Sequence, residues 1–275
     1  MDTFRLTDHS KIIFQKFDLP DRLEGHSDKE KNFYHTFYEQ KDNPLKDLRT
    51  YQYRLLIEEI GLKQAFGNHL DIGCGDGLFV ELCRHLRESE SIGIDAYAPQ
   101  HKPFIFRKSL EDYISDTSRE SKDQKFDVIS FLDVLEHFQN PSLTLNSVKK
   151  LMTPATTLII KVPSKNSLLY RLAKIAARII PQLARGTFIR MYQVNYPPPH
   201  YSYYNFVSLK SLLEQNGFEV EMHGYISETP LRTLKKRLWN IKKVYRPAAF
   251  VVLFLMQIFT PKSMYDGLYV TARLK

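Results

Sequence analysis

A glycine-rich loop is the part of the sequence whose residue types and spacing point most directly to chemistry. Residues 69–79 read His-Leu-Asp-Ile-Gly-Cys-Gly-Asp-Gly-Leu-Phe, with glycine at positions 73, 75 and 77. Glycine reaches positive φ without strain and lets a ligand approach the backbone closely. A strand-like run precedes the loop and a helical pattern follows it, so free N–H groups of the helix would point at the loop. This arrangement suits a ligand that carries a carboxylate or a phosphate.

A carboxylate at the end of the next expected strand makes the signal stronger. Asp95 closes the run Ile-Gly-Ile-Asp, roughly 20 residues beyond the loop, where an acid can accept hydrogen bonds from both hydroxyls of a ribose. Strand, loop, helix, strand and terminal acid together indicate a nucleoside cofactor. No Gly-Lys-Ser/Thr follows the loop, which excludes a P-loop, and the even glycine spacing differs from the dinucleotide pattern. Asp71 would repel a pyrophosphate but fits a ligand with an ammonium group.

The elements that must position these residues alternate along the chain. Strand-like runs are expected at residues 69–72, 91–94, 104–107, 126–131 and 156–162, with helical patterns at 78–87 and 142–151. Short strands that alternate with amphipathic helices predict a parallel sheet with both faces covered. Further along, residues 167–190 and 208–216 are expected to be helical, with Gly217 ending the second helix. Strands are expected at 218–222 and 268–272.

In this order the motifs resemble those of the class I S-adenosylmethionine-dependent methyltransferases. The glycine loop is similar to the family's first motif, which holds the methionine end of the cofactor, and Asp95 is similar to its ribose-binding acid. Residues 109–112 resemble the segment that lines the adenine, and residues 126–137 resemble the fourth strand with its active-site loop. The resemblance implies that S-adenosylmethionine is held by Arg54, Asp71, Gly73, Cys74, Gly75, Asp76, Gly77, Asp95, Ala96, Ser109, Leu110, Leu132 and Asp133.

The resemblance also implies a fold and its divisions. We expect an α/β domain with a Rossmann-like, seven-stranded, mostly parallel sheet, helices on both faces and an antiparallel last strand. Residues 1–55 would form a helical N-terminal cap and residues 56–275 the methyltransferase domain. Within that domain, residues 163–206 would be an inserted helical lid. A basic and apolar helical insertion at residues 230–262 would precede the last strand.

The loop after the fourth strand carries the expected chemistry. Asp133-x-x-Glu136-His137 is similar to the loop of ubiquinone-biosynthesis-type O-methyltransferases, some of which hold a divalent cation with Glu-x-x-Glu-His. This similarity implies Mg²⁺ or Mn²⁺ at Asp133, Glu136 and His137, where the ion would lower the pKa of a substrate hydroxyl. Methyl transfer to a hydroxyl also needs a general base. His137 is the first candidate, because strand ends of open parallel sheets face the ligand, and His200 is the second.

Composition limits the partners and the location. Among 275 residues there are 39 Lys and Arg against 31 Asp and Glu, a formal charge of +8, which favours an anionic partner such as nucleic acid, acidic lipid or a phosphorylated substrate. Two cysteines fit a reducing compartment. No signal sequence is recognisable, and no apolar run reaches the roughly 18 residues of a membrane span. We expect a cytoplasmic protein with peripheral contact to the inner face of an anionic membrane. The contact would be made by residues 167–190 and 232–256, which combine basic and apolar side chains.

The function that these observations favour is S-adenosylmethionine-dependent O-methylation of a small-molecule, lipid-linked or glycan acceptor. One alternative is a nucleic-acid methyltransferase, which the charge and the many tyrosines suggest. The loop at 132–135 lacks the Asn/Asp-Pro-Pro-Tyr/Phe sequence common in base N-methylation, so nucleic acid is not the expected partner. A second alternative is a binding subunit that keeps the fold without turnover. The intact glycine loop argues against loss of the cofactor but does not establish catalysis.

Overall fold

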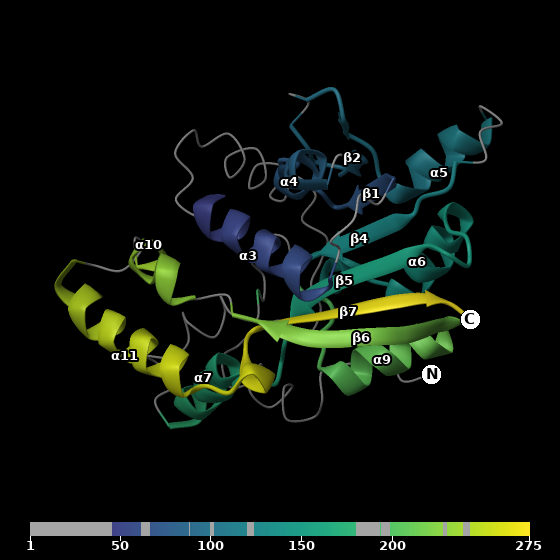
Figure 1. Cartoon of the computed structure of the whole chain (residues 1–275). Helices are drawn as coiled ribbons and strands as arrows, with labels where there is room; N and C mark the ends of the chain where they lie inside the picture. Colours follow the sequence, from purple (N-terminus) through teal and green to yellow (C-terminus); the bar gives the residue numbers. More distant parts are fainter. Residues whose placement is uncertain are drawn as a thin grey trace.

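The computed structural model describes residues 46–61, 67–87, 89–99, 102–119, 124–179, 193, 199–227, 230–238 and 243–275. Its strands form one seven-stranded sheet in the order β3-β2-β1-β4-β5-β7-β6 (Figure 1). They are β1 (Asn68–Ile72), β2 (Glu90–Ile94), β3 (Ile105–Phe106), β4 (Val128–Leu132), β5 (Thr157–Pro163), β6 (Phe218–Ile226) and β7 (Gly267–Leu274). Strands β1 to β5 pair in parallel, and β7 lies antiparallel between β5 and β6. The expected fold class is confirmed.

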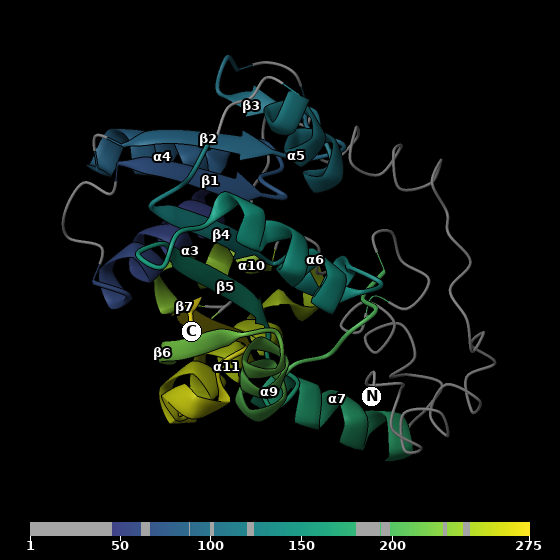
Figure 2. The ribbon, with the colours of Figure 1, turned by 90° about the vertical axis from the view of Figure 1, so that its right-hand side faces the viewer.

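Helices cover both faces of this sheet (Figure 2). On one face lie α3 (Lys46–Glu59) and α4 (Leu78–Arg87), and on the other lie α5 (Leu110–Arg119), α6 (Pro141–Val148) and α9 (Phe206–Gln215). Local signals set the helix ends. Asn140 caps α6 by accepting from the N–H of Leu143, and Asn205 and Ser208 form a reciprocal capping box on α9. Gly217, with φ of 76°, follows α9 as expected.

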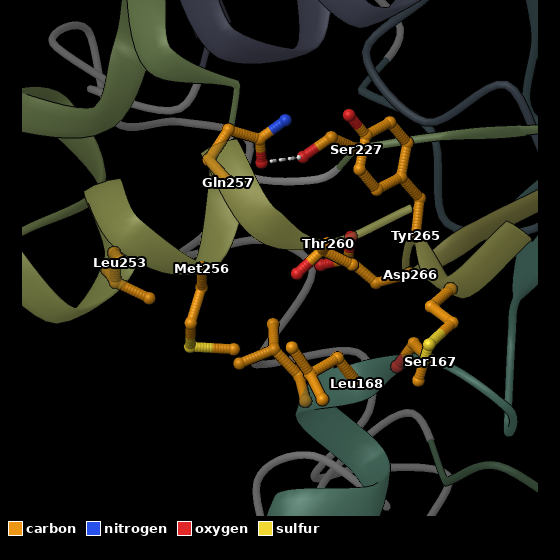
Figure 3. A pocket seen from close by; sticks show the side chains of 11 residues that line it. Ser167, Leu168, Ser227, Leu253, Met256, Gln257, Thr260, Tyr265 and Asp266 are labelled. Atoms are coloured by element: carbon orange, nitrogen blue, oxygen red, sulfur yellow. Dashed lines mark hydrogen bonds between the residues drawn. The ribbon is translucent and has the colours of Figure 1, made fainter. Parts of the chain in front are cut away.

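Three further helices lie outside the sheet layers. Helix α7 (Leu168–Ile179) follows β5, while α10 (Leu234–Arg237) and α11 (Arg246–Phe259) are inserted between β6 and β7. Side chains of α7 and α11 line a common pocket (Figure 3). Residues 1–45, 180–192 and 194–198 lie outside the described part, so most of the expected cap and the far part of the expected lid helix do too. Short 3₁₀ turns complete the chain: η1 (Leu135–His137), η2 (Lys149–Leu151), η3 (Leu231–Thr233), η4 (Lys243–Tyr245) and η5 (Lys262–Met264).

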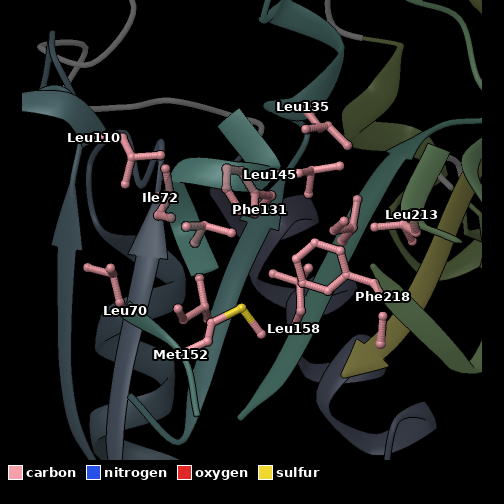
Figure 4. Packing of buried hydrophobic residues seen from close by; sticks show 14 of the residues in the cluster. Leu70, Ile72, Leu110, Phe131, Leu135, Leu145, Met152, Leu158, Leu213 and Phe218 are labelled. Carbon is pink, nitrogen blue, oxygen red and sulfur yellow. The ribbon is translucent and has the colours of Figure 1, made fainter. Parts of the chain in front are cut away.

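The core consists of two apolar layers, one on each face of the sheet. In β4, Ile129 and Phe131 belong to the apolar cluster formed with α5, α6 and α9, in which Figure 4 labels Phe131. Val128 and Leu132 belong to the cluster formed with α3 and α4. Every residue of β4 is therefore buried, which explains why four of its five residues are apolar, with Ser130 as the exception. Because the central strands run in parallel, the loops after β1, β2 and β4 gather at one edge of the sheet. In the described ranges, no helix has both the length and the apolar character needed to cross a membrane.

Candidate functional site

The glycine loop leaves the carboxyl end of β1 with a left-handed backbone. Gly73, Gly75 and Gly77 have φ values of 74°, 56° and 74°, which side chains with a Cβ rarely adopt. The N–H groups of Gly73 and Cys74 both donate to the carbonyl oxygen of Ile94, at 2.8 and 3.2 Å, so the loop is tied to the end of β2. The loop therefore has the left-handed backbone and the strand-end position that its sequence predicts.

Asp95 stands at the end of β2 beside this loop. Its Oδ2 accepts from the N–H of Gly75 at 3.0 Å, and its Oδ1 accepts from the N–H of Tyr97 at 2.7 Å. Burial raises the pKa of Asp95, although these backbone hydrogen bonds oppose the shift. Each carboxylate oxygen can accept a further hydrogen bond. A pair of vicinal hydroxyls, as in ribose, is a suitable donor for that position.

A second carboxyl group lies beneath the loop. Asp71 is buried in β1 and accepts a hydrogen bond from Ser130 Oγ at 2.6 Å. Ser130 Oγ also lies 2.9 Å from His69 Nε2, so hydrogen bonds between polar side chains connect β1 and β4. Burial raises the pKa of Asp71 to about 7. A cationic ligand group near this carboxyl would favour its charged form, and this preference agrees with an ammonium-bearing ligand.

The remaining predicted cofactor residues play different parts. Cys74 is buried, and burial raises the pKa of its thiol, so its side chain is not a nucleophile. Leu110 and Leu132 are core residues on opposite faces of the sheet, and Ala96 is exposed in the turn after Asp95. Ser109 exchanges hydrogen bonds with Asp112, from its Oγ at 2.7 Å and from the Asp112 N–H at 3.1 Å, and so caps α5.

An arginine that sequence reasoning missed approaches the loop. Arg49 on α3 lies 3.7 Å from a carboxylate oxygen of Asp76 and donates to the hydroxyl of Tyr53 at 3.2 Å. Arg54, the predicted arginine, lies on the exposed side of α3. The difference follows from helical geometry, because Arg49 and Tyr53 are one turn apart and share a face whereas Arg54 does not. Tyr53, which is buried, was the signal that could have identified this face.

Asp133 directly follows β4 and has a left-handed backbone conformation, which is unusual for a residue other than glycine. Its φ is 57°, and its carboxylate oxygens lie 2.6 and 2.8 Å from Lys161 Nζ. Lys161 belongs to β5 and is almost completely buried. Sequence reasoning did not single out this lysine, although a charged residue inside the apolar run of residues 157–163 was a usable signal. The carboxylate of Asp133 is engaged by Lys161, and it is not in the acid and histidine cluster that the structure forms.

That cluster consists of Glu136, His137 and His200. One potential ligand atom from each lies within 4.8 Å of the others. His137 Nδ1 is 3.0 Å from the carbonyl oxygen of Pro199, and the N–H groups of Tyr201 and Ser202 donate to the carbonyl oxygen of Glu136. These bonds attach the 3₁₀ turn η1 to residues 199–202, near the end of the expected lid. The structure thus pairs both predicted histidines, with ring centroids 4.7 Å apart.

Burial governs the charge of this cluster. It lowers the pKa of His137 to about 4, and it lowers that of His200 well below its ordinary value. Both rings are therefore neutral near pH 7, as a proton acceptor or a metal ligand must be. Nδ1 of His200 is buried and has no hydrogen-bond partner in the described part of the chain. Nε2 of His200 lies 4.0 Å from Oε1 of Glu136.

The sheet order, the glycine loop and the acid after β2 define a class I S-adenosylmethionine-dependent methyltransferase fold. A family model described as a methyltransferase domain matches residues 45–223. This match covers more than half of the chain, and the chain belongs to that family.

Individual relatives agree with this assignment. The chain is 30% identical over 149 residues to the mitochondrial ubiquinone biosynthesis O-methyltransferase of Dictyostelium discoideum, covering 48% of this chain and 46% of the relative. It is 30% identical over 157 residues to the ubiquinone biosynthesis O-methyltransferase of Pseudomonas putida, covering 54% and 66%. The chain thus spans less than two thirds of each relative. A SAM-dependent methyltransferase structure from Archaeoglobus fulgidus has a TM-score of 0.52 at 21% identity, covering 88% of this chain and 97% of that one, which shows the shared fold.

Proposed function

We propose that the protein transfers a methyl group from S-adenosylmethionine to a hydroxyl oxygen of an acceptor, with His137 as general base. The observation that carries this proposal is the 3.0 Å contact between His137 Nδ1 and the carbonyl oxygen of Pro199. A carbonyl oxygen only accepts, so Nδ1 carries the proton and donates it. Nε2 then holds a lone pair that can take the proton of a hydroxyl. Burial keeps the ring neutral near pH 7, so this lone pair is unprotonated there.

The residues around the loop fit S-adenosylmethionine. The three left-handed glycines would let the methionine end of the cofactor approach the backbone. Asp71, which accepts from Ser130, would favour a cationic group, and Asp95, which accepts from Gly75, would accept from the ribose hydroxyls. Arg49 is a further candidate for the carboxylate of the cofactor, since its guanidinium reaches the loop at Asp76. When bound, S-adenosylmethionine supplies an electrophilic methyl carbon on a sulfonium. The protein's own task is to align the acceptor hydroxyl with that carbon and to remove its proton.

A divalent cation such as Mg²⁺ or Mn²⁺ is a second use of the same cluster. A carboxylate and two neutral imidazoles within 4.8 Å are a chemically suitable ligand set. The fit favours Glu136, His137 and His200 over the expected set with Asp133, because Lys161 holds the carboxylate of Asp133. His137 would then serve as a ligand rather than as the base. Its Nδ1 contact with Pro199 would orient the ring in either role.

Oxygen as the methylated atom is supported by the names of the relatives, which are ubiquinone biosynthesis O-methyltransferases. We therefore favour a small-molecule or lipid-linked hydroxyl, with a glycan hydroxyl as the other member of this class. A protein with a lipid-linked acceptor would work as a peripheral protein at an anionic membrane surface. The loop at residues 132–135, at the end of β4, contains no Pro-Pro dipeptide. Nucleic-acid methylation therefore has less support than O-methylation of a small acceptor.

Cofactor binding is tested by calorimetry with S-adenosylmethionine. We expect micromolar affinity for the natural sequence and a loss of about tenfold or more for Asp95→Ala, because the ribose hydroxyls lose their acceptor. Glu90→Ala is the matched control, since Glu90 is an exposed acid at the opposite end of the same strand. Absence of binding by the natural sequence would contradict the proposal and favour a fold without this cofactor.

The role of His137 is tested by turnover of labelled S-adenosylmethionine with lipid and phenol extracts as acceptors. His137→Gln should reduce turnover by about 100-fold or more while cofactor affinity stays unchanged, since a positioned base contributes on that scale. His85→Gln is the control, because His85 is exposed on α4. Equal turnover by the two variants would remove His137 from the mechanism. Cofactor binding without turnover of any acceptor would favour the non-catalytic alternative.

A further inference from the structure

Helix α11 presents an apolar face to the solvent. Its exposed positions, spaced as one side of a helix, include Val251 at 54%, Leu255 at 46%, Ile258 at 51% and Phe259 at 78% exposure. From Pro247 to Phe259 the helix contains no charged residue. A helix on a solvated surface places polar residues on its outer side, and α11 does the reverse.

The polar group of α11 is on the inner side instead. Gln257 accepts a hydrogen bond from Ser227 Oγ at 2.7 Å, at the end of β6. Together with Leu253, Met256 and Thr260, it faces the pocket shared with α7 (Figure 3). The orientation of α11 is therefore fixed by specific inner contacts, and the apolar outer side is a consequence of the fold.

Helix α7 adds to the same side of the molecule. Its first turn supplies Leu168 and Leu169 to the pocket that α11 lines, and Figure 2 shows both helices beyond the edge of the sheet that β6 forms. Its exposed apolar side chains are Leu172, Ile175 and Ile179. Exposed Arg171 and Arg178 are their neighbours in the sequence. The outer side of α7 thus mixes apolar side chains with cations.

The charge of these regions is strongly one-sided. Residues 163–206 and 230–265 together contain 14 Lys and Arg and no Asp or Glu. The rest of the chain, with 25 basic against 31 acidic residues, is net acidic. The positive charge of the protein is therefore concentrated in the two segments that contain α7 and α11. Exposed Lys243 lies in η4, which directly precedes α11, and exposed Arg232 lies in η3.

We propose that the outer sides of α7 and α11 bind the surface of an anionic lipid bilayer, with α11 lying in the plane of the interface. Apolar side chains would enter the headgroup region while the surrounding cations meet lipid phosphates. At 14 residues, α11 is too short to span a bilayer, which needs about 20. The cations favour anionic lipid over a second copy of this chain, whose matching face would repel them. This inference deepens the proposed function and rests on it only for the purpose of the contact, which is to reach lipid-linked acceptors.

The test is co-sedimentation of the full chain with vesicles, without cofactor or acceptor. We expect the protein to bind vesicles of equimolar phosphatidylcholine and phosphatidylglycerol about tenfold more tightly than vesicles of phosphatidylcholine alone. The variant Val251→Glu/Leu255→Glu should lose about tenfold of that affinity, because two charges would enter the interface. Val207→Glu/Leu143→Glu is the matched control, since both residues are exposed and apolar but lie on α9 and α6.

Equal binding by the two double variants, or no preference for anionic vesicles, would overturn the inference. A dimer in solution that Val251→Glu/Leu255→Glu dissociates, without vesicle binding by the natural sequence, would overturn it in favour of a second copy. Methyl transfer to a water-soluble hydroxyl acceptor separates this inference from the proposed function. Turnover without vesicle binding contradicts only the membrane contact, and vesicle binding without turnover contradicts only the proposed reaction.

Discussion

Lys161 and Asp133 join the carboxyl ends of β5 and β4 through an ion pair, with Nζ 2.8 and 2.6 Å from the two carboxylate oxygens. The N–H of Asp133 also donates to the carbonyl oxygen of Lys161 at 2.8 Å. A left-handed backbone is unfavourable for a residue other than glycine. These contacts hold Asp133 in that conformation, and so determine where the chain enters the turn with Glu136 and His137.

The two halves of this ion pair should differ in their effect on stability. Asp133→Ala removes the carboxylate beside a buried ammonium and should cost about 2 kcal/mol or more of unfolding free energy. Lys161→Met removes the buried charge and leaves a carboxylate that is 40% exposed, so its cost should be about 1 kcal/mol. Urea unfolding measures both. Greater destabilisation by Lys161→Met would contradict this order.

Gly73 should tolerate no side chain. A Cβ there would lie 2.4 Å from a methyl of Val134, in a backbone with φ of 74°. Gly73→Ala should therefore weaken S-adenosylmethionine binding by tenfold or more and cost about 2 kcal/mol of stability. Gly61→Ala is the control, because Gly61 has φ of 66° and no atom of the described residues would lie within 4 Å of a Cβ there. Thermal unfolding and calorimetry measure the stability and the cofactor affinity of both variants. The difference between the variants reports the clash with Val134, because both share the unfavourable φ, and equal effects would exclude the clash.

Affinity for S-adenosylmethionine should depend on the ionisation of Asp71. Its pKa is raised by burial to about 7, so the native carboxyl is protonated below that pH and charged above it. A cationic ligand favours the charged form, and binding should strengthen as pH rises from 5.5 to 7.5 and then level off. Calorimetry should show this trend for the natural sequence and a flatter one for Asp71→Asn. A trend of the opposite sign would place the cation elsewhere.

The pH profile of methyl transfer should extend to unusually low pH. Burial lowers the pKa of His137 to about 4, so the ring stays neutral where an ordinary histidine would be protonated. With His137 as the base and S-adenosylmethionine at saturation, kcat/KM for the acceptor should fall less than twofold between pH 7.5 and 5.5, whereas a base with a pKa near 6.5 would lose about tenfold. Folding must be followed across the same range, because buried neutral histidines destabilise the protein as pH falls. A loss of tenfold with the fold intact would assign the base to another group.

The affinity for a divalent cation should depend on His200 and not on Asp133. If the cluster holds a cation, Mn²⁺ titrated into His200→Ala should bind at least tenfold more weakly than to the natural sequence, since one of three ligands is lost. Asp133→Asn should change Mn²⁺ affinity little, because its carboxylate faces Lys161. Paramagnetic resonance of free Mn²⁺ reports both affinities. A larger loss of Mn²⁺ affinity in Asp133→Asn than in His200→Ala would instead support the ligand set expected from sequence, Asp133, Glu136 and His137.

Much of the fold and the cofactor loop could be predicted because the signals are local. The loop glycines, the acid at Asp95 and the alternation of strands and helices are each contained within a few neighbouring residues. Parallel pairing of consecutive strands through helices then requires that Gly73 and Asp95 meet at one edge of the sheet. The antiparallel last strand came from the family resemblance, and its place between β5 and β6 agrees with it.

By itself, therefore, the sequence determined the fold class, the glycine loop and the carboxylate after β2, since each depends on short-range geometry and periodicity. Tertiary structure alone decided which side chains meet from distant segments. It brought His200 to His137, turned Arg49 rather than Arg54 toward the loop and set Lys161 against Asp133. It also turned the apolar side of α11 outward. These choices depend on how whole elements pack and which face each buries, and no local pattern encodes that packing.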